Sequence, residues 1–191
     1  MPDIDIDFAD RTRALDVLKH IDARIDNDKK HNTGVYCTAV PYNPVTRIST
    51  LNYKEAEERG YFKIDFLNVS VYENIKSKEH LNELMNKEPL WDLLLQDEFV
   101  NLLFHLNGHG DILRKTCPTS VEQLAAVLAM IRPAKRYLIG KDWTTVMSEI
   151  WVKPENDEYY FKKGHAHSYA CLVVVHMNLL CEKIEKGEIT L

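Results

Sequence analysis

The chain is short of the residues that mark several common kinds of protein. Its 191 residues contain only 7 glycines and 7 prolines, and no internal repeat or low-complexity tract is visible. The four cysteines include no C-x-x-C pair, so the sequence does not indicate a structural zinc site. We expect Cys37, Cys117, Cys171 and Cys181 to be reduced thiols of a cytoplasmic protein.

Excess positive charge and long apolar runs are also missing. Lysine and arginine total 24 against 29 acidic residues, a net charge of −5, which argues against tight unaided DNA binding. The acidic beginning of the sequence shows no secretory signal. The longest apolar run, residues 169–180, is interrupted by His176 and Asn178 and is too short to span a bilayer. We therefore expect one domain, or one with a small lobe, and no membrane partner.

The first eight residues form the most regular pattern in the sequence. From Asp3 to Phe8, acidic and apolar residues alternate strictly, which predicts a β-strand. Asp3, Asp5 and Asp7 would line one face, and the apolar face would pack on a core. Neighbouring carboxylates repel, and a divalent cation with oxygen ligands would relieve that cost. The alternative is an edge strand whose charges prevent aggregation.

A second segment, residues 61–67, has the same design. Lys63 and Asp65 would share one face of a strand, and apolar residues the other. Two such strands in one sheet would make a site for two metal ions, the arrangement that supports phosphoryl transfer. Lys63 could neutralise a phosphate there, or form a salt bridge with Asp5 or Asp7.

The remaining pattern predicts an α/β (α+β) protein. An apolar stripe from Ala14 to Ile25 predicts a helix, and residues 33–40 and 45–51 predict strands. Helices are predicted over 77–87, 143–152 and 165–186, and another begins at a capping box over 119–122. We expect a small mixed sheet in residues 1–75 and a helical lobe in residues 76–191, with one compact domain as the alternative.

Six segments, taken together, resemble one known family. Residues 1–8 followed by Asp10-Arg11 closely resemble the palm signature of the bacterial replicative DNA polymerase III alpha subunit, the C family. Residues 63–67, Lys-Ile-Asp-Phe-Leu, are similar to the strand that carries its third catalytic aspartate. Further likenesses follow in the family's order, at residues 29–35, 104–110, 128–133 and 161–170.

The resemblance implies a palm-type sheet with a helical fingers-like lobe. It implies that Asp3, Asp5 and Asp65 hold two Mg²⁺ or Mn²⁺ ions, whereas the residue at Asp7 varies in related enzymes. It also implies a group of basic residues near the nucleotide: Lys30, Lys63, Arg132, Lys163 and His165. Its partners would be a DNA primer-template, a deoxynucleoside triphosphate and other replication proteins. Without the resemblance, Arg132 would be a helix C-terminal cation and Lys30 part of a solvated turn.

The departures from the family keep three functions open. The glycine-serine motif that holds the triphosphate is not in this sequence, and shorter spacings imply a missing thumb and reduced fingers. His105, Asn107 and His109 replace family residues, and the two histidines lack a third metal ligand at fitting spacing. We predict nucleotidyl transfer by a minimal palm. The alternatives are an inactive palm that binds or modulates a replication partner, and a nucleotidyltransferase acting on a substrate other than DNA.

Overall fold

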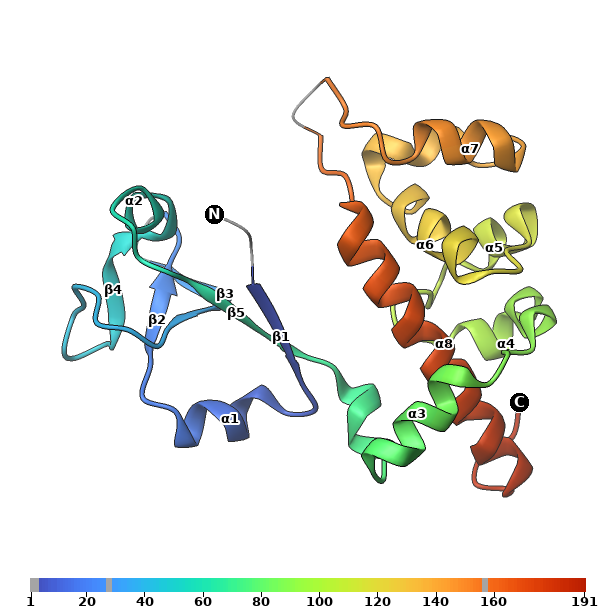
Figure 1. Ribbon diagram of the computed structural model, residues 1–191, viewed down its shortest axis with the longest axis horizontal. Helices are drawn as coiled ribbons and strands as arrows, with labels where there is room; N and C mark the ends of the chain where they lie inside the picture. Colours follow the sequence, from blue (N-terminus) through green and yellow to red (C-terminus); the bar gives the residue numbers. More distant parts are fainter. Residues whose placement is uncertain (1–3, 27–28, 156–157) are drawn as a thin grey trace. The chain divides into compact units, whose positions relative to one another are not determined.

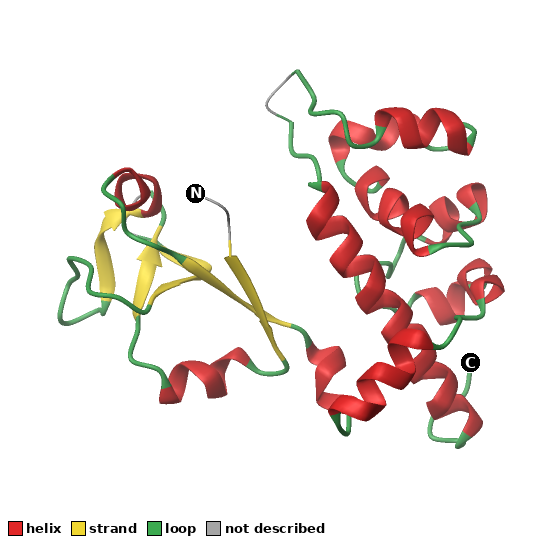
Figure 2. Ribbon diagram, viewed as in Figure 1, coloured by secondary structure: helices red, strands yellow, loops and turns green. Residues whose placement is uncertain are grey.

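The computed structural model of the protein describes residues 4–26, 29–155 and 158–191. The chain divides into two compact units, Met1–Asn74 and Ile75–Leu191. In the described residues, the first unit contains a mixed sheet with short helices and the second contains only helices (Figures 1 and 2). The prediction of an α/β fold with a helical C-terminal segment is confirmed.

The sheet has five strands in the order β1-β5-β3-β2-β4. They are β1 (Ile4–Phe8), β2 (Ile21–Arg24), β3 (Lys30–Tyr36), β4 (Ile48–Asn52) and β5 (Ile64–Asn68). β1 pairs with β5 in parallel and β2 with β4 in parallel, whereas β3 is antiparallel to both β2 and β5. The helices of this unit are α1 (Arg11–Val17), α2 (Tyr53–Glu58) and the 3-10 helix η1 (Ser70–Asn74). β1 is therefore an edge strand (Figure 1).

The predicted helix through Ile25 is wrong in its second half. α1 ends at Val17, its C-cap Leu18 is extended with φ −95° and ψ 126°, and β2 begins at Ile21. Residues 21–24 alternate between apolar and charged types, which is the strand period. Ala23 is fully buried in a small core with residues of β3 and α2, and Ile21 packs against it. Packing onto the sheet therefore outweighs the helical spacing of the preceding residues.

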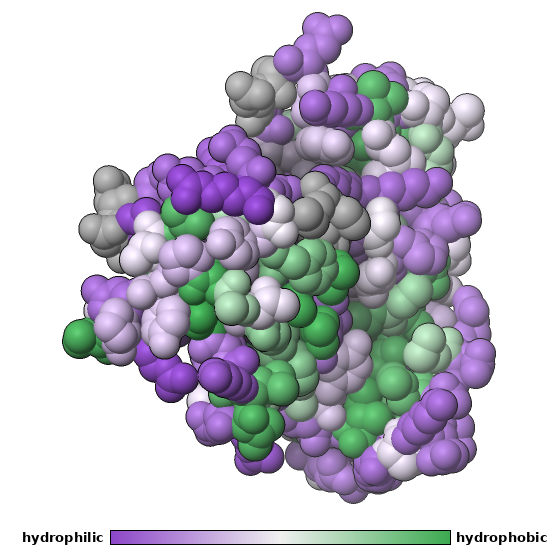
Figure 3. Space-filling model, turned by 60° about the vertical axis from the view of Figure 1, so that its left-hand side comes forward, coloured by the Kyte–Doolittle hydropathy of each residue, from purple (hydrophilic) through white to green (hydrophobic). Residues whose placement is uncertain are grey.

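The apolar face of β1 is only partly covered. Phe8 packs against Phe66 with ring centroids 4.8 Å apart, but Ile4 and Ile6 are 39% and 37% exposed. The expectation that this whole face packs on a core is wrong at Ile4 and Ile6, because an edge strand has a neighbour on one side only. α1 adds little cover, since it has no buried residue. On the face drawn in Figure 3, apolar side chains reach the surface in groups.

The second unit is built around α6 and α8. Its elements are α3 (Lys78–Asn86), η2 (Trp91–Leu95), α4 (Asp97–Val100), α5 (Gly110–Thr116), α6 (Val121–Met130), η3 (Pro133–Leu138), α7 (Trp143–Glu149) and α8 (Lys163–Glu185). Every residue of α6 from Leu124 to Met130 is buried, and α8 runs beside it (Figure 1). Asn178 of α8 is 1% exposed, and its Nδ2 donates to the carbonyl oxygens of Leu84 and Lys87 at 2.9 and 2.8 Å. That amide ties the last turn of α3 to α8.

Local capping rules place the helix starts closely. Ser77 caps α3 by accepting from the amide of His80 at 3.2 Å, as its sequence position suggests. The cap of α6 is Ser120, one residue after the predicted Thr119, and it accepts from Gln123 N at 3.2 Å. Both ends follow from side-chain oxygens that satisfy otherwise unpaired first-turn amides. Among the described residues, no helix combines the length and apolar character needed to cross a membrane.

Candidate functional site

The pairing of β1 with β5 places two of the predicted acidic residues side by side. Asp5 is the register partner of Asp65 in this parallel pair. Register partners on adjacent strands point to the same face of a sheet, and adjacent strands lie about 4.8 Å apart. The third predicted ligand, Asp3, lies outside the described residues. Asp5 and Asp65, which the sequence predicted on two separate strands, therefore lie side by side on one face of the sheet.

Asp65 lies in a group of four side chains that we name the Asp65 cluster: Asp65, Lys63, Thr33 and His31. The Lys63 ammonium donates a hydrogen bond to Oδ2 of Asp65, and Thr33 Oγ1 donates to Oδ1 at 2.6 Å. His31 Nδ1 lies 3.7 Å from the same Oδ1. Burial alone would raise the pKa of Asp65, but the bonds from Lys63 and Thr33 outweigh it and hold that pKa below its usual value. Asp65 is therefore an ionised carboxylate.

A bulge in β3 brings Thr33 to Asp65. On β2, Asp22 pairs with Val35 and Arg24 with Lys30, so two steps on β2 match five on β3. The extra residues of β3 leave the ordinary ladder, and bulges of this kind commonly re-aim a side chain beside a functional site. Thr33 lies within this bulge and reaches a carboxylate on the neighbouring strand.

His31 and Gly34 make the bulge possible. His31 Nδ1 accepts the backbone amides of Gly34 and Thr33 at 2.9 and 3.2 Å, so this nitrogen carries no proton. Burial, Lys63 and Arg11 lower the pKa of His31, although Asp65 opposes them. A Cβ on Gly34 would lie 2.7 Å from Lys63 Cδ and 3.1 Å from His31 Nδ1. A glycine inside a strand is the sequence signal for this close approach, and it was not used to predict the bulge.

Asp7 lies two residues along β1 from Asp5 and on the same face. Its register partner is Leu67, so it has no acidic neighbour on β5. Burial and the nearby charge of Asp5 raise the pKa of Asp7. Burial is the larger cause of this rise, and the repulsion from Asp5 adds to it.

The donor set at this position fits a magnesium or manganese ion in its chemistry. Mg²⁺ takes oxygen ligands, and Asp5 and Asp65 present carboxylates on one face. The Lys63 ammonium already neutralises Asp65, which marks this side of the carboxylate as a cation position. Within residues 4–26, 29–155 and 158–191, no group of three His, Cys, Asp or Glu residues is placed to hold a metal. Any metal at this position would need Lys63 to turn away from Asp65.

Two further residues support this face of the sheet. Tyr36 follows Gly34 by two residues on β3, is 1% exposed, and its hydroxyl has no hydrogen-bond partner among the described residues. Burial, followed by the charges of Asp65 and Glu57, raises its pKa. Arg11 donates from its guanidinium to the carbonyl oxygen of Asn32 in the bulge. The sequence analysis gave no role to either residue.

Lys30 does not join the Asp65 cluster. Its ammonium forms an ion pair with Asp22 Oδ2 at 2.8 Å. Asp22 neighbours Ala23, whose Cβ faces the Gly34 position, so alternation puts Asp22 on the opposite face of β2. The predicted phosphate contact of Lys30 therefore has no support from its position.

Arg132 and His165, both in the helical unit, meet at one aromatic ring. The Arg132 guanidinium lies 5.1 Å from the centroid of Phe161 and 5.9 Å from that of Tyr159. The His165 ring faces Phe161 at 6.5 Å with an interplanar angle of 3°. Arg132 Nε is buried without a hydrogen-bond partner among the described residues. The structure thus brings together two residues that the sequence placed near the nucleotide.

Lys163 lies on a different surface of the helical unit. It lines a cavity of about 700 Å³ with His167, Trp151 and Met147. Glu122, in the first turn of α6, is also in its wall. Lys163 begins α8, where unpaired amides favour an anion, but the same wall carries this carboxylate.

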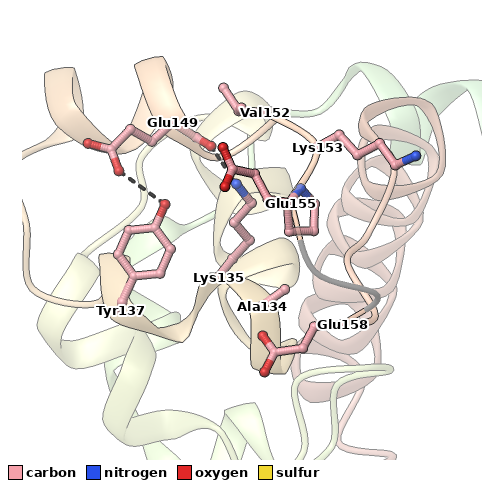
Figure 4. Close-up of a pocket in the computed structure, with 9 residues that line it drawn as sticks. Ala134, Lys135, Tyr137, Glu149, Val152, Lys153, Glu155 and Glu158 are labelled. Carbon is pink, nitrogen blue, oxygen red and sulfur yellow. Dashed lines mark hydrogen bonds between the residues drawn. The ribbon is translucent and has the colours of Figure 1, made fainter.

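Another cavity of the helical unit, about 620 Å³, contains the buried lysine Lys135 (Figure 4). Lys135 is 3% exposed, and its Nζ donates to the backbone carbonyl of Glu149 at 2.7 Å. Tyr137 donates from its hydroxyl to the carboxylate of the same residue at 3.0 Å. Burial lowers the pKa of Lys135. Glu149 is the last residue of α7. The bond from Lys135 satisfies its carbonyl oxygen and the bond from Tyr137 holds its side chain, so both have a structural role at the helix C-terminus.

Comparison of the chain with protein-family models, curated proteins and solved structures finds no match.

Proposed function

We propose that this protein is a divalent-cation-dependent nucleotidyltransferase, a reduced palm of the DNA polymerase III alpha type that extends a DNA primer. The observation that supports the proposal best is the parallel register of Asp5 with Asp65, which puts the two motif aspartates on one face. The ordered likeness of six segments to that family also supports it, and four of those segments lie outside these two strands. We also place the protein in the cytoplasm, with its four cysteines unpaired.

The chain's own residues would have distinct tasks in this reaction. Asp5 and Asp65, with Asp3, would hold Mg²⁺ or Mn²⁺, ions that stabilise charge on attacking and leaving oxygens when bound. Thr33 would keep Asp65 oriented through its 2.6 Å hydrogen bond. Lys63 would exchange its carboxylate partner for a phosphate oxygen of the substrate.

Primer extension by the purified chain with Mg²⁺ or Mn²⁺ tests the proposal. We expect incorporation by the wild type and a loss of at least about 100-fold in Asp5→Ala and in Asp65→Ala. Asp65→Ala also removes an ion pair and can weaken the sheet, whereas Asp5 lies on the exposed edge strand. Asp5→Ala therefore keeps the test valid if Asp65→Ala unfolds.

Asp16→Ala, which changes an exposed acid of α1, is the matched control and should keep full activity. The polymerase proposal fails if the folded wild type incorporates nothing at high enzyme concentration. It also fails if Asp5→Ala and Asp65→Ala, both shown by circular dichroism to be folded, incorporate as well as the wild type.

One observation favours a second candidate, an inactive palm that binds a replication protein. Lys63 and Thr33 already satisfy both oxygens of Asp65, an arrangement that is complete without metal. Manganese binding separates the candidates, because the enzyme should bind Mn²⁺ and lose that binding in Asp5→Ala. A wild type that binds no Mn²⁺ and incorporates nothing would favour the inactive palm.

A further inference from the structure

A small cavity of about 270 Å³ in the sheet unit has basic residues and no acid among its lining residues. It lies where β2 begins and β3 ends, beside the turn that leads into β4. Lys19 and Arg47 supply its charge, and His20 adds an imidazole ring. The cavities that contain Lys135 and Lys163 each include glutamates in their walls, and the whole chain carries a charge of −5. The positive charge of this cavity therefore contrasts with the negative net charge of the chain.

Asp22, an acidic residue close to His20, does not neutralise the positive charge of the cavity. Asp22 Oδ1 is 4.0 Å from His20 Nε2, but the same carboxylate is paired with Lys30 at 2.8 Å. His20 Nδ1 lies 2.8 Å from the carbonyl oxygen of Leu18, which fixes the ring with Nδ1 as the donor.

Arg47 is held in a backbone conformation that few non-glycine residues adopt. Its φ is 58°, and the chain stays there because Arg47 N donates to Asn43 O at 2.8 Å and Arg47 O accepts from Asp22 N at 3.0 Å. Among the described residues, its guanidinium makes no hydrogen bond or ion pair. A fixed backbone with an unpaired planar cation suits a phosphate or carboxylate, which can accept two parallel hydrogen bonds.

The other walls of the cavity are apolar or aromatic. Tyr36 and Val40 are buried there, Ile21 is half-buried, and Tyr42 is 46% exposed. The volume of about 270 Å³ is just below the range of ordinary ligand cavities, which begins near about 300 Å³, so the cavity suits only a small ligand. We propose that this cavity binds a small organic phosphate ester that carries one ring, with the phosphate at Arg47 and Lys19 and the ring against Tyr42.

Cys37 gives a direct way to test the site. Its thiol is exposed and lines the cavity, whereas Cys117 is an equally exposed thiol in the helical unit. Alkylation of the intact chain by iodoacetamide, measured by peptide mass spectrometry, compares the two thiols in one sample. Phenyl phosphate, inorganic phosphate and benzyl alcohol are the probes, and EDTA is present throughout to exclude binding through a metal at the aspartates.

We expect phenyl phosphate to slow Cys37 alkylation at least about fivefold and to leave Cys117 unchanged. Arg47→Asn should raise the concentration for half-protection about tenfold, because it removes the charge and keeps a residue that tolerates positive φ. Arg13→Ala is the control, since this arginine of the same unit is 88% exposed and outside the cavity. Its half-protection concentration should equal that of the wild type.

Three results would overturn the proposal. They are equal slowing of both thiols, equal protection by benzyl alcohol, and an unchanged half-protection concentration in Arg47→Asn. Protection by inorganic phosphate that equals protection by phenyl phosphate would reject the ring contact and leave only a general anion site. Because EDTA is present, a failure here leaves the primer-extension test unaffected.

Discussion

The two units differ in what their buried residues do. In the helical unit, α6 is buried from Leu124 to Met130 and packs along α8, so burial there serves packing. In the sheet unit, the partly buried Asp65 cluster consists of charged and polar side chains, and the β1 edge beside it is exposed. Apolar burial supplies stability, whereas a half-buried ionised cluster costs desolvation and is kept where chemistry needs it. We therefore expect the helical unit to contribute the larger share of stability, and under the proposed function the sheet unit would hold the reacting groups.

Truncation of one apolar residue in each unit should show this difference most strongly. Leu124→Ala removes a fully buried side chain and should lower the free energy of unfolding by about 3–4 kcal/mol. Ile6→Ala removes a side chain that is 37% exposed and should cost about 1 kcal/mol or less. Urea unfolding followed by circular dichroism measures both. Equal costs would show that β1 contributes as much to stability as α6 does.

Lowering the pH should reduce the free energy of unfolding of the helical unit through His176 on α8. Burial, with Lys183 nearby, lowers the pKa of His176 to about 4, and its Nδ1 accepts the amide of Phe104 at 3.2 Å. Below about pH 6.5 the unfolded chain binds a proton that the folded chain refuses, so stability falls from pH 6.5 towards pH 4. The loss should reach about 3 kcal/mol at pH 4, and it should be absent above pH 7.

Tryptophan fluorescence follows this loss specifically, because all three tryptophans, Trp91, Trp143 and Trp151, are in the helical unit. His176→Gln removes the titrating group and should flatten this part of the curve. An unchanged pH dependence in that variant would assign the acid sensitivity to other groups, such as His105, whose pKa burial also lowers.

Two glycine substitutions should have smaller effects than Leu124→Ala, one destabilising and the other neutral or stabilising. Gly34→Ala puts a Cβ 2.7 Å from Lys63 Cδ, so it should cost about 1–2 kcal/mol and shift Lys63 from Asp65. Gly164→Ala, in the first turn of α8, meets nothing within 4 Å and should be neutral or stabilise by up to about 0.5 kcal/mol. Hydrogen exchange, read separately over each unit, distinguishes the two. A harmless Gly34→Ala would show that the bulge does not require the close approach.

Some elements were readable from the sequence because their causes are local. Alternation predicted β1 and the strand around Asp65, and Ser77 marked the start of α3. The bulge at Thr33 was not predicted, because it depends on the pairing of β3 with two strands that are distant in sequence. The sequence also offered Asp5 and Asp7 as salt-bridge partners of Lys63, whereas the structure pairs Lys63 with Asp65, two residues further along the chain. The predicted helix through Ile25 was wrong in its second half, because residues 21–24 form a strand that pairs with β3 and β4.

The parallel pairing of β1 with β5 also sets an order of events during synthesis. β1 leaves the ribosome first, but its partner follows about 60 residues later, as the register of Asp5 with Asp65 requires. β2, β3 and β4 are complete by then and can pair among themselves, since their contacts are closer in sequence. The acidic face is consequently the last part of the sheet to form, because β1 cannot join the sheet until β5 has been synthesised.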